Sequence, residues 1–544
     1  MYHHSAACKS LPAFIIIAAS ILVGIYIRLD QFLDQTLIDD EWHAVHQLLY
    51  STPEKFATSF GHADYSIPLT LLYWLESRLF GLSELLMRWP MLLFGMATLI
   101  VFPVVVYRQL SQQEASLFAF LLALSPLLDL YSRTARPYAI TLFLVYLSVW
   151  AFYKFYQQST PELPAKRFQY AAIYCLSASF AVWLHLIVVF FVVSPFVVEG
   201  IELFLKPRAE RKRDFVALLR IGLPTLLLSS AFLLPPMLSS LSALTVKTGA
   251  HLPSLDTLAG AVYLWMGSRS GFIVALCCLL ALVGLPRLLK QSSITLNILV
   301  GAALTLALIF LSQPAWVNHP LTLGRYLLPL LPLLLLSVAS GLYVMLEILG
   351  KLSAYPVACL ALMIGFVVYS PLDHFMHRPN RNTLHPIYSF EFRDEKNITL
   401  HYHRAKQYSD FWRQFENAQP ESITIAVAPW YFESFNWDAP VWEQLSHQVI
   451  VPGYLIGLCV AERAGEVPNT ERYRFRNVSY LANPQDLHQR GVDYIVYQKP
   501  NRLNIKKPYA KINHCDHFLQ RIYGSPVYED QIVKVYDPSV KVSG

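Results

Sequence analysis

The sequence predicts a polytopic α-helical membrane protein with a soluble α/β domain at its C-terminal end. The 544-residue chain is 55% hydrophobic and only 15% charged, whereas an average soluble domain carries about 25% charged residues. Its mean hydropathy is +0.39, and many apolar runs approach the roughly 20 residues that a membrane span requires. After about Pro371 these runs shorten, and charged residues, His and Asn become more frequent. The net charge of +6 does not indicate nucleic-acid binding, because the basic residues that matter lie in short loops between apolar runs.

The first apolar run, residues 11–27, resembles the first half of a signal peptide. Lys9 precedes it, and Arg28-Leu29-Asp30 follows in place of a small-residue cleavage site. We therefore expect an uncleaved membrane helix with a cytoplasmic amino end. The next apolar stretch, residues 67–80, is too short for a span and contains Glu76 and Arg78, which favours a helix lying along the membrane interface.

Ten further runs bring the predicted number of spans to roughly eleven. They cover approximately residues 86–107, 114–131, 137–157, 168–187, 188–205, 215–239, 271–289, 294–312, 327–348 and 353–370. Alternate loops then form two sets. One set holds most of the topogenic Lys and Arg residues and is expected to be cytoplasmic. The other set contains the acidic loop Asp39-Asp40-Glu41 and every other motif of chemical interest, although its loops hold some basic residues too.

The polar C-terminal part is long enough for one soluble domain of ordinary size. We place the boundary between a transmembrane domain, 1–379, and this domain, 380–544. Short or alternating apolar runs predict strands at 422–428, 448–451, 492–498 and 527–535, and helices are expected at 401–415 and 484–490. Cys459 and Cys515 fall in this part, and one disulfide between them is possible if the domain faces an oxidising compartment.

The acidic loop supplies the first candidates for chemistry. Asp40 and Glu41 adjoin the expected membrane surface, and Trp42 and His43 follow them. Solvated loop acids are the ordinary interpretation. A carboxylate in this position is also suited to act as a general base toward an acceptor hydroxyl, or to bind a divalent metal. Asp39 is a weaker candidate for either task.

Basic residues and histidines provide the complementary candidates. Arg133, Arg136 and Arg325 lie at the outer ends of spans, where topogenic arginines are not expected, and a guanidinium binds phosphate in a bidentate manner. Snorkelling toward the interface is the ordinary alternative. His62 is a candidate to bind phosphate or a metal, and the alternative is that it belongs to a turn. His185 is also a candidate to bind phosphate or a metal, and the alternative is that it only packs against its neighbours.

In their order along the chain, these motifs resemble the GT-C superfamily of membrane glycosyltransferases. The motifs are Asp40-Glu41, His62 to Pro68-Leu69, Leu79-Phe80-Gly81-Leu82-Ser83-Glu84 with Arg88-Trp89-Pro90, Tyr131 to Tyr138, His185, and Arg325-Tyr326-Leu327-Leu328-Pro329. Within the superfamily, the chain looks like the bacterial branch related to protein O-mannosyltransferases and the lipid A aminoarabinose transferase. The Lys-Pro-Pro of the aminoarabinose transferase is replaced here by Tyr65-Ser66-Ile67-Pro68, which weakens the resemblance to that particular substrate.

The resemblance implies a polyprenyl-phosphate sugar donor and transfer with inversion to an extracytoplasmic lipid, glycan or protein of the cell envelope. It also implies that the chain lies in a bacterial inner membrane. Carried over, Asp40 is the catalytic acid with Glu41 beside it. The phosphate-binding arginines come from Arg133, Arg136 and Arg325, with Tyr138 and Tyr326 positioning phosphate or sugar. Metal dependence varies in the family, so a divalent metal at His62 and His185 stays open.

A transporter or flippase for a lipid-linked sugar is the competing interpretation. Such proteins place ionisable residues near the bilayer midplane. The runs 137–153, 294–312 and 353–370 contain no Asp, Glu, Lys or Arg, and the ionisable motifs gather at one surface instead. This pattern favours chemistry at the surface over passage through the membrane.

Overall fold

The computed structural model describes most of the membrane part and the core of the C-terminal part. The described residues are 11–30, 32, 39–41, 43–44, 47–48, 51–60, 65–82, 84–157, 164–245, 248–249, 252–268, 270–370, 408–415, 417–420, 422–428, 442, 445–451, 455–456, 479–480, 491–499 and 513–540. Among the predicted features, His62, the side chains of Asp39, Cys459 and Cys515, and the helix expected at 484–490 lie outside this set.

The described residues between 11 and 370 form a helical bundle, and each of the eleven predicted spans coincides with helix over its described residues. Its elements are α1 (Leu11–Leu29), η1 (Asp39–Glu41), α3 (Pro53–Ala57), α4 (Ile67–Leu79), α5 (Glu84–Gln109), α6 (Gln112–Ala123), α7 (Pro126–Arg133), α8 (Tyr138–Gln157), α9 (Pro164–Leu184), η2 (Leu186–Val188), α10 (Val189–Leu205), α11 (Arg208–Thr245), α12 (Leu255–Met266), α13 (Gly271–Gln291), α14 (Ser293–Ser312), α15 (Pro320–Tyr326), η3 (Leu328–Leu330), α16 (Leu331–Ile348), η4 (Leu352–Ala354) and α17 (Tyr355–Val368).

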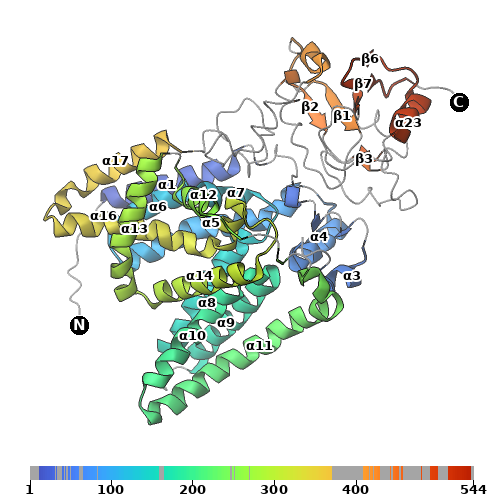
Figure 1. Ribbon diagram of the computed structural model, residues 1–544. Helices are drawn as coiled ribbons and strands as arrows, with labels where there is room; N and C mark the ends of the chain where they lie inside the picture. Colours follow the sequence, from blue (N-terminus) through green and yellow to red (C-terminus); the bar gives the residue numbers. More distant parts are fainter. Residues whose placement is uncertain are drawn as a thin grey trace.

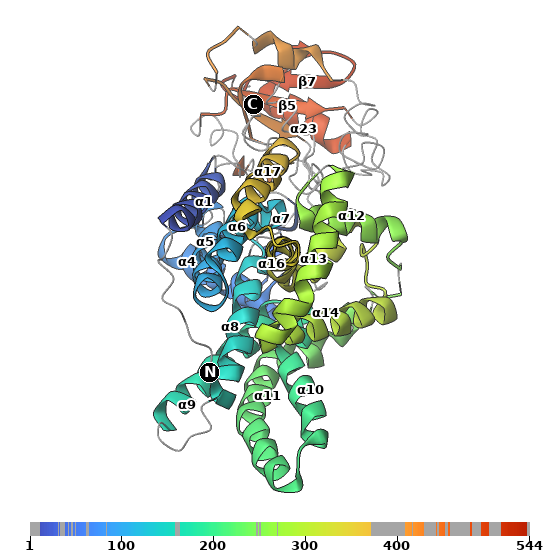
Figure 2. The same cartoon turned by 90° about the vertical axis from the view of Figure 1, so that its left-hand side faces the viewer.

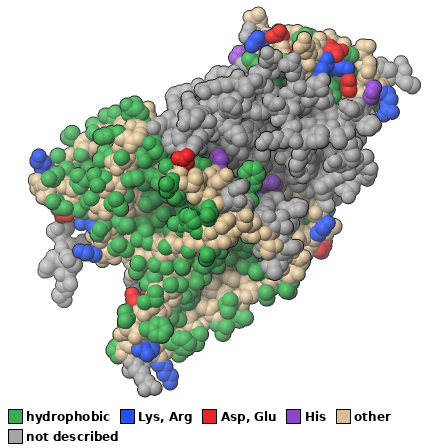
Figure 3. Space-filling view, viewed as in Figure 1, with side chains coloured by type: hydrophobic (Ala, Val, Ile, Leu, Met, Phe, Trp, Pro, Cys, Tyr) green, Lys and Arg blue, Asp and Glu red, His purple; other side chains and the backbone are tan. Residues whose placement is uncertain are grey.

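The chain is a multi-pass membrane protein. Within the described residues, seven helices are long and apolar enough to cross a membrane, or eight if the bent pair α6–α7 is one span, and α1 and α17 contain shorter apolar helices. The face of the bundle that Figure 3 shows is largely hydrophobic, and only a few charged side chains appear on it. A lipid environment accounts for this distribution, because a soluble protein rarely exposes contiguous apolar surface on this scale.

Two predicted elements differ from the structure in detail. The run 114–131 was expected to be one span, but it consists of α6 and α7, which meet at 54°. Pro126 begins α7, and Ser125 before it is extended, because a residue that precedes proline avoids the α region. The region 240–270, which the sequence places between the predicted spans 215–239 and 271–289, contains the end of α11 and the whole of α12.

The segments that carry the predicted motifs meet at one end of the bundle. These are η1 after α1, the turn between α7 and α8, the junction of α9 with η2, and α15 before α16. A second hydrophobic cluster, separate from the main core, packs beneath the acidic loop and includes Leu48, Phe56, Leu69, Tyr73 and Ala135. The opposite end is tied by a different network, in which buried Glu114 of α6 accepts hydrogen bonds from Arg287 of α13 and Ser340 of α16.

The C-terminal part contains a small mixed sheet, in agreement with the predicted strands. A five-stranded sheet has the order β2-β1-β5-β7-β6, in which β1 is parallel to β2 and β5, and β7 is antiparallel to β5 and β6. Figures 1 and 2 show it at one end of the helical bundle. Its elements are η6 (Asp410–Phe415), β1 (Thr424–Ala428), β2 (Val449–Val451), β5 (Tyr494–Gln498), α23 (Asn513–Tyr523), β6 (Tyr528–Glu529) and β7 (Val533–Tyr536), and β3 (Leu455–Ile456) pairs with β4 (Ser479–Tyr480).

Candidate active site

The carboxylate of Asp40 lies between two arginines from distant parts of the chain. Its Oδ2 is 2.7 Å from Nη1 of Arg325 and 3.8 Å from Nη2 of Arg136. Arg136 also donates from Nη1 to the backbone carbonyl of Asp40 at 3.4 Å. The other oxygen, Oδ1, is 3.4 Å from Nε2 of His43. The structure thus brings together an acid from the start of the chain and guanidinium groups from two later segments.

Glu41, the neighbouring acid, points to a different arginine. It accepts hydrogen bonds from Nε and Nη2 of Arg88 at 2.8 and 2.6 Å, and from the backbone N–H of Ala135 at 2.7 Å. Both charged side chains are fully buried. Because Ala135 directly precedes Arg136, this network fixes the turn that carries Arg136 relative to the acidic loop. Arg88 was not among the predicted site residues, and the signal for it was a lone charge within an apolar run.

Arg133, the last residue of α7, and Arg136, in the turn before α8, have different partners. Arg133 donates to the carbonyls of Ile27 and Asp30 at 2.9 and 2.7 Å, which are acceptors at the C-terminal end of α1. The helix ends at Arg133, and the chain turns before Arg136. The structure therefore places Arg136 at Asp40 and engages Arg133 with α1.

Aromatic rings enclose the guanidinium of Arg325. Its Cζ lies 5.6 Å from the ring centre of Tyr138 and 5.8 Å from that of Tyr326, distances typical of cation–π contacts. The ring of His185 packs 5.0 Å from Tyr138 and 6.0 Å from Tyr326. The predicted residues Tyr138, His185 and Tyr326 therefore surround the same cation.

The short helix α15 is anchored so that Arg325 is held in place. Pro320 stands in its first turn, where proline needs no hydrogen-bond partner. Trp265 of α12 donates from Nε1 to the carbonyl of Gly324 at 3.3 Å, and Thr257 donates to the carbonyl of Asn318 at 2.7 Å. These contacts from α12, which the sequence did not predict, fix both ends of α15.

Electrostatic interactions keep Asp40 ionised and His185 neutral. Burial opposes ionisation of Asp40, but Arg136, Arg325 and the hydrogen bond from His43 outweigh it and hold the pKa of the carboxyl well below its usual range. Burial, together with the positive charges of Arg136 and Arg325, lowers the pKa of His185 to about 3. The imidazole is therefore an uncharged hydrogen-bonding group at neutral pH.

The described residues do not assemble a metal-binding cluster. No group of three or more His, Cys, Asp and Glu side chains with suitable placement occurs among them. The positive charges of Arg136 and Arg325 act on His185, and they disfavour a further cation there. His62, the other predicted metal or phosphate ligand, lies outside the described residues.

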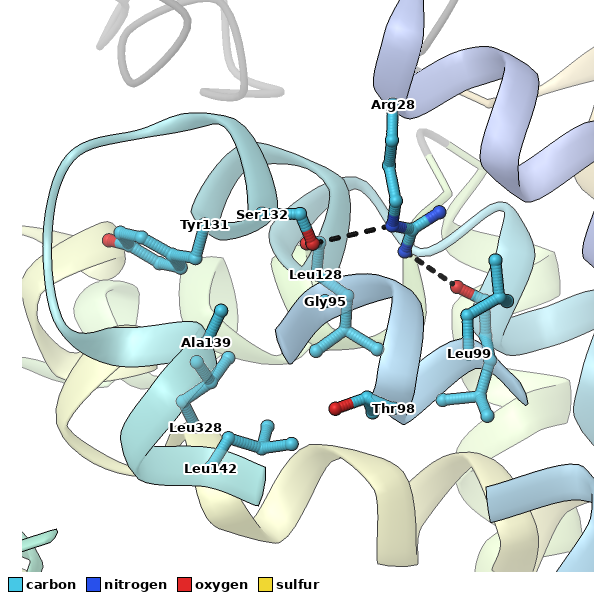
Figure 4. A pocket seen from close by; sticks show the side chains of 11 residues that line it. Arg28, Gly95, Thr98, Leu99, Leu128, Tyr131, Ser132, Ala139, Leu142 and Leu328 are labelled. Carbon is cyan, nitrogen blue, oxygen red and sulfur yellow. Dashed lines mark hydrogen bonds between the residues drawn. The ribbon is translucent and has the colours of Figure 1, made fainter. Parts of the chain in front are cut away.

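A small, mostly apolar cavity is lined in part by Tyr131 (Figure 4), whose ring packs 4.5 Å from that of Tyr138. Arg28 also lines this cavity. Its guanidinium donates to Ser132 at 3.3 Å and to the carbonyls of Gly24, Ala123 and Leu122 at 2.9 to 3.4 Å. The N–H groups of Arg28 are thus hydrogen-bonded to other parts of the protein. We therefore assign Arg28 to the joining of α1, α6 and α7 and not to the site.

No known family model and no curated protein sequence matches the chain. Its structure is similar over nearly its whole length to ArnT from Cupriavidus metallidurans, with TM-scores of 0.44 for the apo state and 0.42 for the state bound to undecaprenyl phosphate. The identities are 12% and 13%, with 97% and 98% of this chain and 98% and 99% of ArnT covered. It is also similar to the oligosaccharyltransferase AglB from Archaeoglobus fulgidus in complex with an inhibitory peptide and a dolichol-phosphate. There the TM-score is 0.45 and the identity 11%, with 90% of this chain and 69% of AglB covered.

Proposed function

We propose that this protein is a membrane glycosyltransferase that moves a sugar from a polyprenyl-phosphate carrier to an extracytoplasmic lipid, glycan or protein, with inversion. The observation that carries the proposal is the position of Asp40 between Arg136 and Arg325, 2.7 Å from the latter. An acid and two fixed cations are the groups that such a transfer needs. The acid serves the entering hydroxyl, and the cations serve the leaving phosphate.

In this proposal, Arg136 and Arg325 bind the phosphate of the carrier. Negative charge builds on that phosphate as the bond between the sugar carbon and the phosphate oxygen breaks, and the oxygen leaves with the electron pair. Fixed cations stabilise this developing charge without reorganisation, and removing one such group typically costs about 3 kcal/mol. Tyr138 and Tyr326, which enclose Arg325, limit its movement and provide surfaces for the sugar.

Asp40 is the proposed base. It takes the proton of the acceptor hydroxyl while the acceptor oxygen forms its bond to the sugar carbon on the side opposite the phosphate, which inverts the configuration. Glu41 does not contact substrate in this scheme. Its carboxylate is occupied by Arg88 and Ala135, so its function is to position Arg136.

We also propose how the chain is arranged in the membrane. Residues 1–379 form the catalytic membrane domain and residues 380–544 an extracytoplasmic domain. The amino terminus is cytoplasmic, and the active site opens to the outer side of a bacterial inner membrane. The positive-inside pattern of the loops supports this orientation.

The experiment is turnover of a radiolabelled polyprenyl-phosphate sugar by the purified chain in proteoliposomes, with an envelope extract as the acceptor. We expect consumption of the donor by the wild type and none above background by Asp40→Asn. Arg220→Gln, on the exposed surface of α11, is the matched control for loss of a charge and should retain full turnover. Equal turnover by Asp40→Asn would exclude Asp40 as the base.

A further inference from the structure

The carboxylate of Asp40 is an anion that already occupies Arg325, the proposed phosphate-binding residue. Its Oδ2 lies 2.7 Å from Arg325 Nη1, the distance of a charge-assisted hydrogen bond. Arg136 approaches the same oxygen at 3.8 Å. The rings of Tyr138 and Tyr326 enclose Arg325, so its guanidinium has little freedom to turn away and serve a second anion elsewhere.

The geometry points to an exchange of anions in which the donor phosphate displaces Asp40 from Arg325, so that Asp40 reaches the acceptor only in the donor-bound site. This inference rests on the proposed function and adds the regulation of the same site. A carboxylate held by two arginines is a weak base, because the ion pairs favour its ionised form. Once phosphate neutralises the arginines, this restraint is relieved, and Asp40 is a better acceptor for the hydroxyl proton.

His43 can hold the carboxylate of Asp40 in place during the exchange. Its Nε2 lies 3.4 Å from Asp40 Oδ1, whereas both arginines approach Oδ2. The two oxygens of one carboxylate therefore have separate partners. When Oδ2 leaves Arg325, the contact from His43 to Oδ1 can persist, and the carboxylate stays beside the site.

The backbone that carries Asp40 need not move during the exchange. Glu41, the next residue, is fully buried and joined to Arg88 and to the N–H of Ala135. This network holds the acidic loop and the turn before Arg136 in a fixed relation. The side chain of Asp40 is 19% exposed and is the part that changes partner.

The exchange imposes an order on the two substrates. Without a donor, Asp40 is engaged by the arginines and does not activate an acceptor hydroxyl. With a donor bound, the base and the leaving group are prepared together. A consequence is that Asp40 competes with the phosphate for the arginines, so its removal should strengthen phosphate binding even though it abolishes transfer.

The test measures the affinity of the full chain in detergent for a polyprenyl phosphate that lacks sugar, so that no turnover interferes. We expect Asp40→Asn to bind this lipid roughly three- to tenfold more tightly than the wild type, because a competing ion pair has been removed. Asp40→Ser removes the same anion with a smaller side chain and should give the same gain. Arg325→Gln should bind more weakly than the wild type.

Glu76→Gln is the matched control. Glu76 is a buried carboxyl group that accepts a hydrogen bond from Trp89 Nε1 at 2.8 Å. This variant removes a buried acid that is not paired with Arg325, so its affinity should stay near that of the wild type. If both Asp40 variants bind equally or more weakly while Arg325→Gln loses binding, the exchange is excluded and the proposed function stands. If neither the wild type nor any variant binds the lipid, the proposed function itself fails.

Discussion

Replacing Glu41 by Gln tests whether the buried pair with Arg88 holds the site together. The two side chains are fully buried and joined at 2.8 and 2.6 Å, and Glu41 also accepts from the N–H of Ala135 at 2.7 Å. Gln keeps the shape of the side chain but removes the negative charge that pairs with the buried guanidinium of Arg88. Breaking a buried pair in this way typically costs about 3–5 kcal/mol.

The purified chain is unfolded in detergent by heat or by denaturant, and its stability is measured. Turnover of the donor is measured on the same variants. Glu41→Gln should unfold several degrees below the wild type, and turnover should fall because Arg136 loses its fixed place. The double variant Glu41→Leu/Arg88→Met removes both charges, so it should recover most of the lost stability. Unchanged stability of Glu41→Gln, or a double variant less stable than Glu41→Gln, would refute this account of the pair.

Three further predictions concern the site. Arg325→Lys should lower the rate of transfer about 100-fold, since an ammonium replaces the planar fork at the leaving phosphate, and Arg220→Lys should not; single-turnover measurement with labelled donor checks this. The folded-state pKa of Asp40 is depressed, so the stability difference between the wild type and Asp40→Asn should be constant above the ordinary carboxyl pKa of about 3.9 and should shrink only at lower pH. Unfolding measured across pH tests this. A difference that vanishes between pH 5 and 7 would contradict the pairing of Asp40 with the arginines. The pKa of His185 is lowered to about 3 in the folded protein, so between about pH 3 and 6.5 its imidazole binds a proton in the unfolded chain but not in the folded one. The wild type should therefore lose stability relative to His185→Gln as the pH falls through that range. Equal pH dependence of the two proteins would show that the imidazole is not buried near the arginines.

The sequence predicted the class of fold because membrane helices follow from composition and length. Every predicted span coincides with helix, but among the described residues only seven or eight helices are long and apolar enough to cross a membrane, fewer than the roughly eleven predicted. The strands expected at 422–428 and 492–498 correspond to β1 and β5. The break between α6 and α7 was missed, although Pro126 was its signal, since the apolar run continues through the bend. The second part of the region 240–270 was missed as well, because α12 has 12 residues, too few to resemble a span.

The same reasoning applied to the site found the segments but not the direction of each side chain. Asp40 and Glu41 are adjacent in sequence, and only the turn of η1 decides that one meets Arg325 and the other Arg88. Arg133 and Arg136 look equivalent as residues, yet the end of α7 directs the first to the carbonyls of α1 and the second to Asp40. Such choices depend on tertiary packing around a turn, which a single sequence does not reveal.

A structure of the full chain with a bound polyprenyl phosphate is the most direct test of the central claim. The account predicts phosphate oxygens within hydrogen-bonding distance of Arg325 and Arg136, with Asp40 Oδ2 released from Arg325. A phosphate bound away from both arginines, with Asp40 and Arg325 still paired, would contradict it.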